Sequence, residues 1–148
     1  MSSDVQGGLG YLVGQLSQRV RRLYEAELAP FRLNMPQYAT LTYLAAAPGG
    51  LPAAEIARRL HLTPQAVSLL AARLEAAGHV TRAEPTTGRS QPLLLTEAGR
   101  DQLVAARGAI VQAEAEAFAP LGANDREALR RLLAACLAPD ASGPGPGE

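Results

Sequence analysis

Apolar residues recur with the period of an α-helix over the first third of the chain. From Leu9 they fall at spacings of three, four and seven residues, which predicts an amphipathic helix that ends at Pro30. Asn34 and Pro36 are start signals for a second helix, and Pro48-Gly49-Gly50 ends it. The pattern therefore predicts two helices before the centre of the chain.

Two shorter helices are predicted next, with a tight turn between them. Pro52 opens the first. Thr63 is suited to cap the second helix. Pro64 fits the first position of that helix, because the backbone N–H that proline lacks would have no hydrogen-bond partner within the helix there. Gly78 suits the left-handed residue that ends this helix.

Two strands are predicted after these helices, at residues 79–83 and 91–95, with a Pro- and Gly-containing connection. A helix, a turn, a second helix and a hairpin follow one another in a winged helix-turn-helix. In that fold, one helix enters a DNA groove and the hairpin, or wing, reaches the backbone. We therefore predict a mostly α protein with a small β-hairpin wing.

The helical period returns after the hairpin. Thr96 begins a long helix that Pro120-Leu121-Gly122 breaks, and another amphipathic helix follows. In so short a chain, we expect the apolar stripes at both ends to meet those of a second copy, although packing on their own domain is the alternative. The predicted parts are an N-terminal dimerisation helix (1–33), a DNA-binding domain (34–95), C-terminal dimerisation helices (96–138) and a disordered tail (139–148).

Charge is balanced overall but uneven along the chain. Fourteen Arg oppose fourteen Asp and Glu, and Lys is absent. Residues 51–95 hold five Arg and three Glu, a balance of +2, whereas residues 96–148 hold five Arg and eight acids, a balance of −3. Any affinity for DNA should therefore depend on a few contacts, doubled by dimerisation.

Several function classes lack support. The sequence has no run of eighteen apolar residues and no secretory signal, so we expect a cytoplasmic protein without a membrane span. His61 and His79 are isolated, and no nucleophile–base pair or phosphate loop is evident, so we expect no metal, no cofactor and no enzyme. The single cysteine, Cys136, lies on an apolar stripe, where burial would keep it inert.

Two stretches resemble the MarR family of bacterial transcriptional regulators: PQYATLTYLAAAPGGLPAAEIARRLHLTPQAVSLLAARLEAAGHVTR and LLLTEAGRDQL. The resemblance extends over about residues 9–138. It implies a homodimer formed by the terminal helices, with one recognition helix of each subunit in the major groove of a roughly palindromic site. Family members commonly repress transcription, and many release DNA when a small aromatic or phenolic compound binds.

Candidate DNA contacts follow from the residue types in the recognition helix and the wing. Gln can pair with adenine, and Ser or Thr can bind bases or phosphates, although capping and an ordinary solvated surface are the alternatives. An Arg in the wing suits a narrow minor groove. The predicted DNA-binding residues are Thr63, Pro64, Gln65, Ser68, Leu69, Arg73, Arg82, Arg89 and Ser90.

Several of these residues have a second interpretation. Arg73 could instead form an ion pair with Glu75 or Glu84, and Arg89 could simply be a solvated loop residue. Leu69 could contact a thymine methyl group, or its side chain could pack in the hydrophobic core.

The chain also departs from the family pattern. Ala66, Leu69 and Ala72 stand where polar or basic residues, followed by an aspartate, are usual, and Thr87 replaces an aspartate in the wing. These departures leave a second function open, a winged-helix module that binds a protein or a ligand and has lost DNA binding.

The resemblance further implies an effector pocket between the dimer helices and the winged domain. Phe31, Met35, Tyr38 and Tyr43 lie in the corresponding region and are the predicted pocket residues. Aromatic residues at helical spacing can equally be core. The chain has no tryptophan, which argues against the urate-responsive subgroup.

Overall fold

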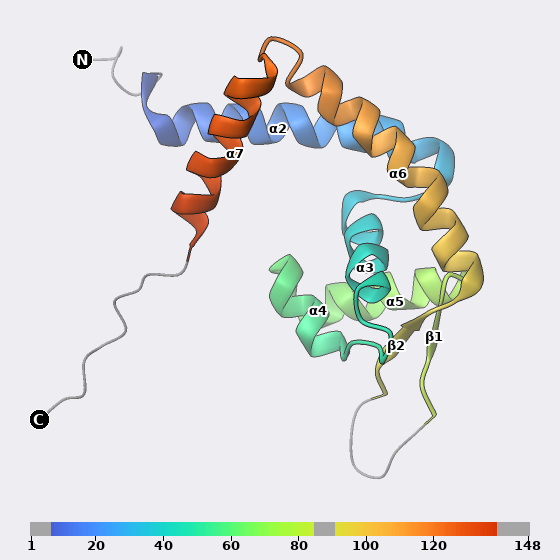
Figure 1. Ribbon diagram of the computed structural model, residues 1–148. Helices are drawn as coiled ribbons and strands as arrows, with labels where there is room; N and C mark the ends of the chain where they lie inside the picture. The colour runs from blue at the N-terminus through green and yellow to red at the C-terminus, as the bar shows by residue number, and fades with distance from the viewer. Residues whose placement is uncertain (1–6, 85–90, 139–148) are drawn as a thin grey trace, which may run out of the picture. The chain divides into compact units, whose positions relative to one another are not determined.

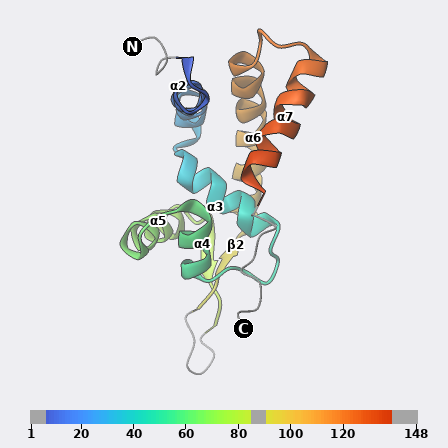
Figure 2. The same cartoon turned by 90° about the vertical axis from the view of Figure 1, so that its left-hand side faces the viewer.

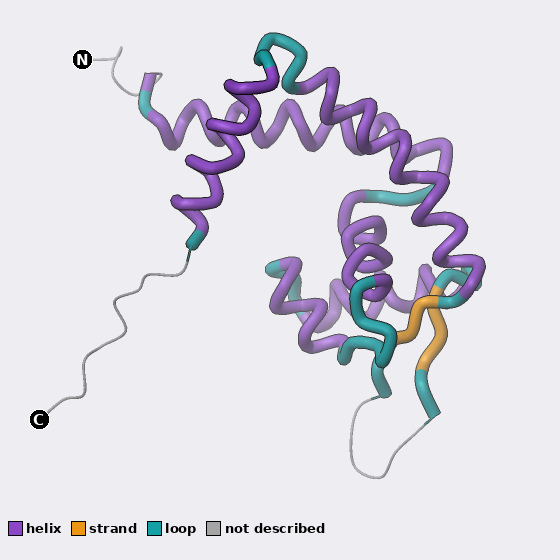
Figure 3. The backbone as a smooth tube through the Cα atoms, in the orientation of Figure 1, coloured by secondary structure: helices purple, strands orange, loops and turns teal. Residues whose placement is uncertain are grey.

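The computed structural model describes residues 7–84 and 91–138. Residues up to Ala117 belong to one compact unit, and the residues from Phe118 belong to a second. None of the helices in the described ranges is long and apolar enough to cross a membrane. The elements are α2 (Leu9–Leu28), a 3-10 turn (Ala29–Phe31), α3 (Met35–Ala45), α4 (Ala53–Leu60), α5 (Pro64–Ala76), β1 (Val80–Arg82), β2 (Leu93–Leu95), α6 (Glu97–Ala117) and α7 (Ala123–Leu137) (Figures 1 and 3).

Three of the predicted helix starts are confirmed by capping hydrogen bonds, whereas α4 and α7 have no side-chain cap, so the cap that Asn124 and Glu127 suggest for the last helix is wrong. Asn34 and Gln37 form a reciprocal capping box, in which each backbone N–H donates to the other side chain at 2.9 Å. The Thr63 hydroxyl accepts from the backbone N–H of Ala66 at 3.2 Å. Thr96 caps α6 in the same way. These short polar side chains fix where α3, α5 and α6 begin.

The wing consists of two short antiparallel strands. Val80 pairs with Leu95, and Arg82 pairs with Leu93. Leu51 adds an isolated bridge, because its backbone N–H and C=O both bond to Leu93, at 3.0 and 2.9 Å. The two predicted strands are thus confirmed, but each is only three residues long. Most of the connection between them lies outside the described residues.

One apolar core joins the helix-turn-helix to the hairpin. Its fully buried side chains come from α2, α3, α4, α5 and β2, and they include Leu28, Leu41, Leu44, Ile56, Val67, Leu74 and Leu93. Burial of each such side chain contributes about 1.5–3 kcal/mol. This core therefore fixes one face of α5 and leaves the opposite face to solvent.

Helices α2 and α6 lie side by side in the first unit (Figures 1 and 2). Leu103, Ala106 and Ile110 of α6 are buried. Gly99 lets the start of α6 approach the chain between α5 and β1, because a Cβ there would collide with the carbonyl oxygen of His79. The predicted fold class, a winged helix-turn-helix flanked by terminal helices, is confirmed.

Helix α7 forms the second unit, and the structure corrects one prediction about it. Its apolar side chains Leu132, Leu133 and Leu137 are exposed in the single chain. Cys136 is a free, exposed cysteine, so the burial expected from the apolar stripe is not found. The spacing of the stripe is that of a packed helix, but its side chains are exposed among the residues that the structure describes.

Candidate nucleic-acid interface

The turn between α4 and α5 is short because each helix has a defined end. His61 has a left-handed conformation, with φ of 53°, and its N–H bonds back to the end of α4. Thr63 then caps α5, and Pro64 occupies the first turn. Ile56 of α4 and Val67 of α5 are both fully buried. The two helices are therefore held firmly at the turn, as a helix-turn-helix requires.

The outer face of α5 carries most of the predicted recognition residues. Val67, Leu70, Ala71 and Leu74 face the core. Because successive residues turn by about 100°, residues 65, 69 and 72 lie on the opposite side. The exposed residues on and beside that face, with the N-terminal end of the helix, are Thr63, Pro64, Gln65, Ser68, Leu69, Ala72 and Arg73. Leu69 is 56% exposed, so the interpretation of Leu69 as a core residue is wrong.

The arginines of this region differ in their partners. Arg82 of β1 donates two hydrogen bonds to Glu75 of α5, at 3.0 and 3.3 Å, and this pair ties the wing to the recognition helix. Over the described residues, Arg73 forms no ion pair with Glu75 or Glu84, in contrast to the alternative interpretation. Arg89 and Ser90 lie outside the described residues, so their predicted role stays a prediction.

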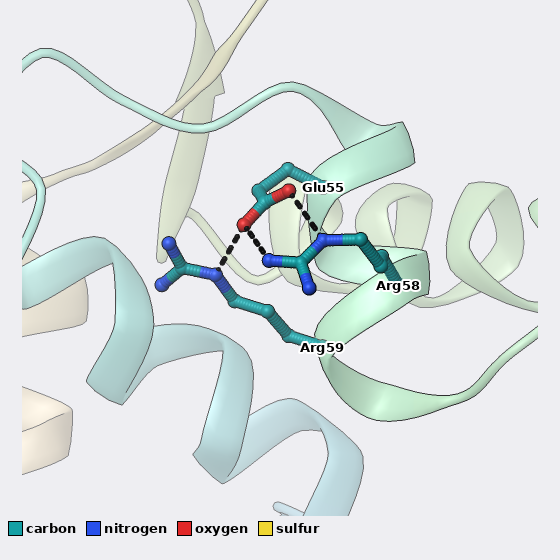
Figure 4. Close-up of polar contacts among 3 residues, drawn as sticks. All are labelled: Glu55, Arg58 and Arg59. Carbon is teal, nitrogen blue, oxygen red and sulfur yellow. Dashed lines mark hydrogen bonds and ion pairs between the residues drawn. The ribbon is translucent and has the colours of Figure 1, made fainter. Parts of the chain in front are cut away.

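A charged cluster on α4 was not found by sequence reasoning. Arg58 donates two hydrogen bonds to Glu55, at 3.0 and 2.7 Å, and Arg59 donates one at 2.7 Å (Figure 4). The guanidinium of Arg59 also lies 5.3 Å from the centre of the Tyr43 ring. The i, i+3 and i+4 spacing of one acid and two bases was the available signal.

These contacts change the ionisation of Glu55. Hydrogen bonds from Arg58 and then Arg59 lower the pKa of the carboxyl from 4.5 to about 2. Glu55 in turn raises the pKa of Arg58. The cluster holds two positive charges against one negative charge, so α4 presents a net positive charge close to the turn.

A cleft of about 690 Å³ opens beside the C-terminal half of α5. Arg32 and Arg73 supply two positive charges to its lining, and Arg32 has a left-handed conformation with φ of 55°. Gln102 of α6 donates to the carbonyl oxygen of Phe31 at 2.7 Å. The lining residues are Phe31, Arg32, Leu33, Asn34, Gln37, Arg73, Leu74, Ala77, His79 and Gln102.

The cleft differs from the effector pocket predicted from the sequence. Of the four predicted pocket residues, only Phe31 lines this cleft. Met35, Tyr38 and Tyr43 are partly buried and pack against the core. Among the described residues, the Nδ1 atom of His79 is buried without a hydrogen-bond partner, and His79 belongs to the lining. Segments distant in sequence thus form a cleft with two cationic side chains, and it shares Phe31 with the predicted pocket.

Comparisons with known proteins agree with this geometry. A sequence model of the MarR family matches residues 33–90. Over 126 residues the chain is 36% identical to the HTH-type transcriptional repressor Rv2887 of Mycobacterium tuberculosis, a match that covers 84% of this chain and 90% of the relative.

Solved structures of the same Mycobacterium tuberculosis protein extend the match to three dimensions. Its complex with salicylic acid is 34% identical with a TM-score of 0.76, and the match covers 92% of this chain and 99% of that one. Its complex with DNA is 32% identical with a TM-score of 0.78, and the match covers 89% and 99%. The chain belongs to the MarR family of winged helix-turn-helix transcriptional regulators.

Proposed function

We propose that this protein is a transcriptional repressor that binds double-stranded DNA as a homodimer and is released by a small aromatic acid. The observation that carries the proposal is the exposed outer face of α5 on a firmly held helix-turn-helix. The similarity to a repressor that has been solved in complex with DNA supports it.

Helix α5 would enter the major groove with its N-terminal end foremost. Gln65 would pair with a base, and Ser68 would bind a base or a phosphate. The Thr63 oxygen already accepts a bond from Ala66, but its hydroxyl hydrogen remains free to donate to a phosphate. The positive end of the helix dipole adds attraction for that phosphate. DNA binding through these contacts does not require a large net positive charge on the chain.

Dimerisation would bring two such helices to one palindromic site. Helices α2 and α6 pack on each other, yet Leu9, Leu12 and Val13 of α2 and Val104 and Val111 of α6 remain exposed. A second copy that covered these side chains would form the dimer, with residues 1–33 and 96–138 as its dimerisation parts. The two α5 helices would then read half-sites about one helical turn of DNA apart.

The DNA-binding role is tested by a titration against the DNA upstream of the gene. Gln65→Ala should weaken binding about 5- to 150-fold for each half-site, because a bidentate base contact contributes about 1–3 kcal/mol. Gln112→Ala removes the same side chain from an exposed position on α6. Where light scattering shows that its dimer is intact, it is the matched control, with unchanged affinity expected. A folded dimer that gives no shift at low salt would contradict the proposal.

The cleft beside α5 is the proposed effector site. Arg32 and Arg73 would bind a carboxylate, since a guanidinium forms paired hydrogen bonds with it. Its volume, about 690 Å³, is within the usual range for small-molecule sites. Because Arg73, Leu74 and Ala77 belong to α5 or follow it directly, an occupant would press on the recognition helix. The salicylic acid complex of the relative supports this ligand class.

Thermal shift measurements with two matched ligands test the effector site. Salicylate should raise the melting temperature, whereas salicylamide, which has the same ring without the negative charge, should raise it much less. Arg32→Asn removes the guanidinium but keeps a residue that tolerates a left-handed backbone, and it should weaken salicylate binding at least about tenfold. Equal shifts with both ligands, or unchanged binding by the variant, would exclude this cleft.

A further inference from the structure

The outer face of α5 is almost entirely apolar along its central line. Gln65, Leu69, Ala72 and Ala76 recur at spacings of four, three and four residues, and all four are exposed. They lie opposite the buried side of the helix. After the single amide of Gln65, this line presents only methyl and isobutyl groups.

Leu69 is the one large side chain on this line. It is 56% exposed, and it lies on a different helix from the exposed apolar residues of α2 and α6. Its neighbours along the line, Gln65 and Ala72, are polar or small, so they do not extend it into a broad apolar patch. A protein partner usually needs such a patch with aromatic anchors. The exposed surface of Leu69 instead matches a single small apolar group.

The major groove offers one group of that kind. Thymine presents a C5 methyl group there, and an apolar side chain that is long enough to reach this group recognises it by contact. The same methyl group occurs on 5-methylcytosine. Leucine has no donor or acceptor, so it cannot bond to the edge of an unmethylated cytosine or of a purine.

We propose that Leu69 reads the C5 methyl group of a pyrimidine in each half-site of the operator. The inference rests on the proposed entry of α5 into the major groove and adds the chemistry of one base position. Affinity for the operator then depends on a methyl group that takes no part in base pairing. Methylated cytosine at that position substitutes in part for thymine.

Removal of the methyl group alone tests the proposal. Operators are selected from random DNA with the full chain, and each thymine is replaced in turn by deoxyuridine, which pairs identically. Replacement at one position in one half-site should weaken binding about fourfold, the effect of about one buried CH₂ group, and replacement at that position in both half-sites about 15-fold. At the same position, a 5-methylcytosine duplex should bind more tightly than the cytosine duplex.

Two variants separate this inference from DNA binding itself. Leu69→Ala should bind thymine and deoxyuridine operators equally at that position, whereas Gln65→Ala should bind both more weakly but keep their ratio. If operators are bound but deoxyuridine has no effect at any position, or if Leu69→Ala keeps the ratio, the assignment of Leu69 is wrong and DNA binding stands. If no operator is selected, the proposed function itself fails. Circular dichroism melting checks that the exposed substitutions leave the fold intact.

Discussion

At the scale of single residues, position on a helix decides what a charged side chain can do. Arg58 and Arg59 of α4 share one carboxylate, that of Glu55, whereas Arg73 of α5 has no acidic partner among the described residues and borders the cleft. Arg82 is held by Glu75. The net charge of residues 51–95 does not show which arginines are paired with an acid and which are not. Free guanidinium groups, rather than total charge, are the groups available to phosphates and carboxylates.

The cluster of Glu55, Arg58 and Arg59 predicts how the ionisation of Glu55 and the stability of the fold depend on pH. Its folded pKa, about 2, is below the ordinary value of 4.5, so the cluster stabilises the fold above pH 4.5 and loses this effect as the pH falls towards 2. The NMR chemical shift of the Glu55 carboxyl carbon should therefore stay constant between about pH 6 and 3.5, the interval in which an unpaired Glu passes the midpoint of its titration.

Two variants complete that test. Arg58→Gln should raise the pKa of Glu55 towards its ordinary value, because it removes the main hydrogen-bond donor and leaves Arg59 as the remaining one. Arg130→Gln, in the similar i, i+3 pair with Glu127 on α7, should leave Glu55 unchanged. A wild-type Glu55 that titrates near 4.5 would rule out the cluster in solution.

At the scale of elements, the junction between α5 and α6 holds the recognition helix in place. Thr96 caps α6 and also donates to the carbonyl oxygen of Gly78 at 2.6 Å. Gly78 has φ of 76°, the left-handed value that ends α5. The start of α6 is thus bonded directly to the end of α5.

Gly99 should be essential to this junction. A Cβ at residue 99 would collide with the His79 carbonyl oxygen and lie 2.8 Å from Leu95 Cδ1, so Gly99→Ala should destabilise the fold by about 1–3 kcal/mol in chemical denaturation. Gly108→Ala is the control on the same helix, because a Cβ there meets nothing within 4 Å. It should be neutral or stabilise by up to about 1 kcal/mol. Equal stability of the two variants would show that the close approach is absent.

The elements also show what the sequence could and could not predict. Asn34, Thr63 and Thr96 act on backbone within three residues of themselves, so local pattern identified all three caps. The exposure of Leu69 could not be decided, since a leucine at that spacing fits either face. The cleft was missed because residues 31–37, 73–79 and 102 meet only in the folded chain.

At the scale of the whole molecule, a chain of zero net charge would bind DNA through a few well-placed contacts. Salt-sensitive contacts would come from a few arginines and from the N-terminal end of helix α5 in each of the two subunits. Specificity would come from Gln65, Ser68 and Leu69. The apolar residues left exposed on α2 and α6 would be covered in the dimer. Light scattering should therefore give about twice the chain mass of 15.5 kDa. A stable monomer at micromolar concentration would contradict this assembly.

The most direct test of DNA binding is the salt dependence of operator affinity. Fluorescence anisotropy with a selected operator should give saturable binding by two chains per duplex at 50 mM salt. Between about 50 and 200 mM salt, the logarithm of the binding constant should fall linearly with the logarithm of the salt concentration, with a slope of about −0.9 per phosphate contact. A scrambled duplex should bind much more weakly. Absence of saturable binding at 50 mM, or equal affinity for the two duplexes, would contradict the account.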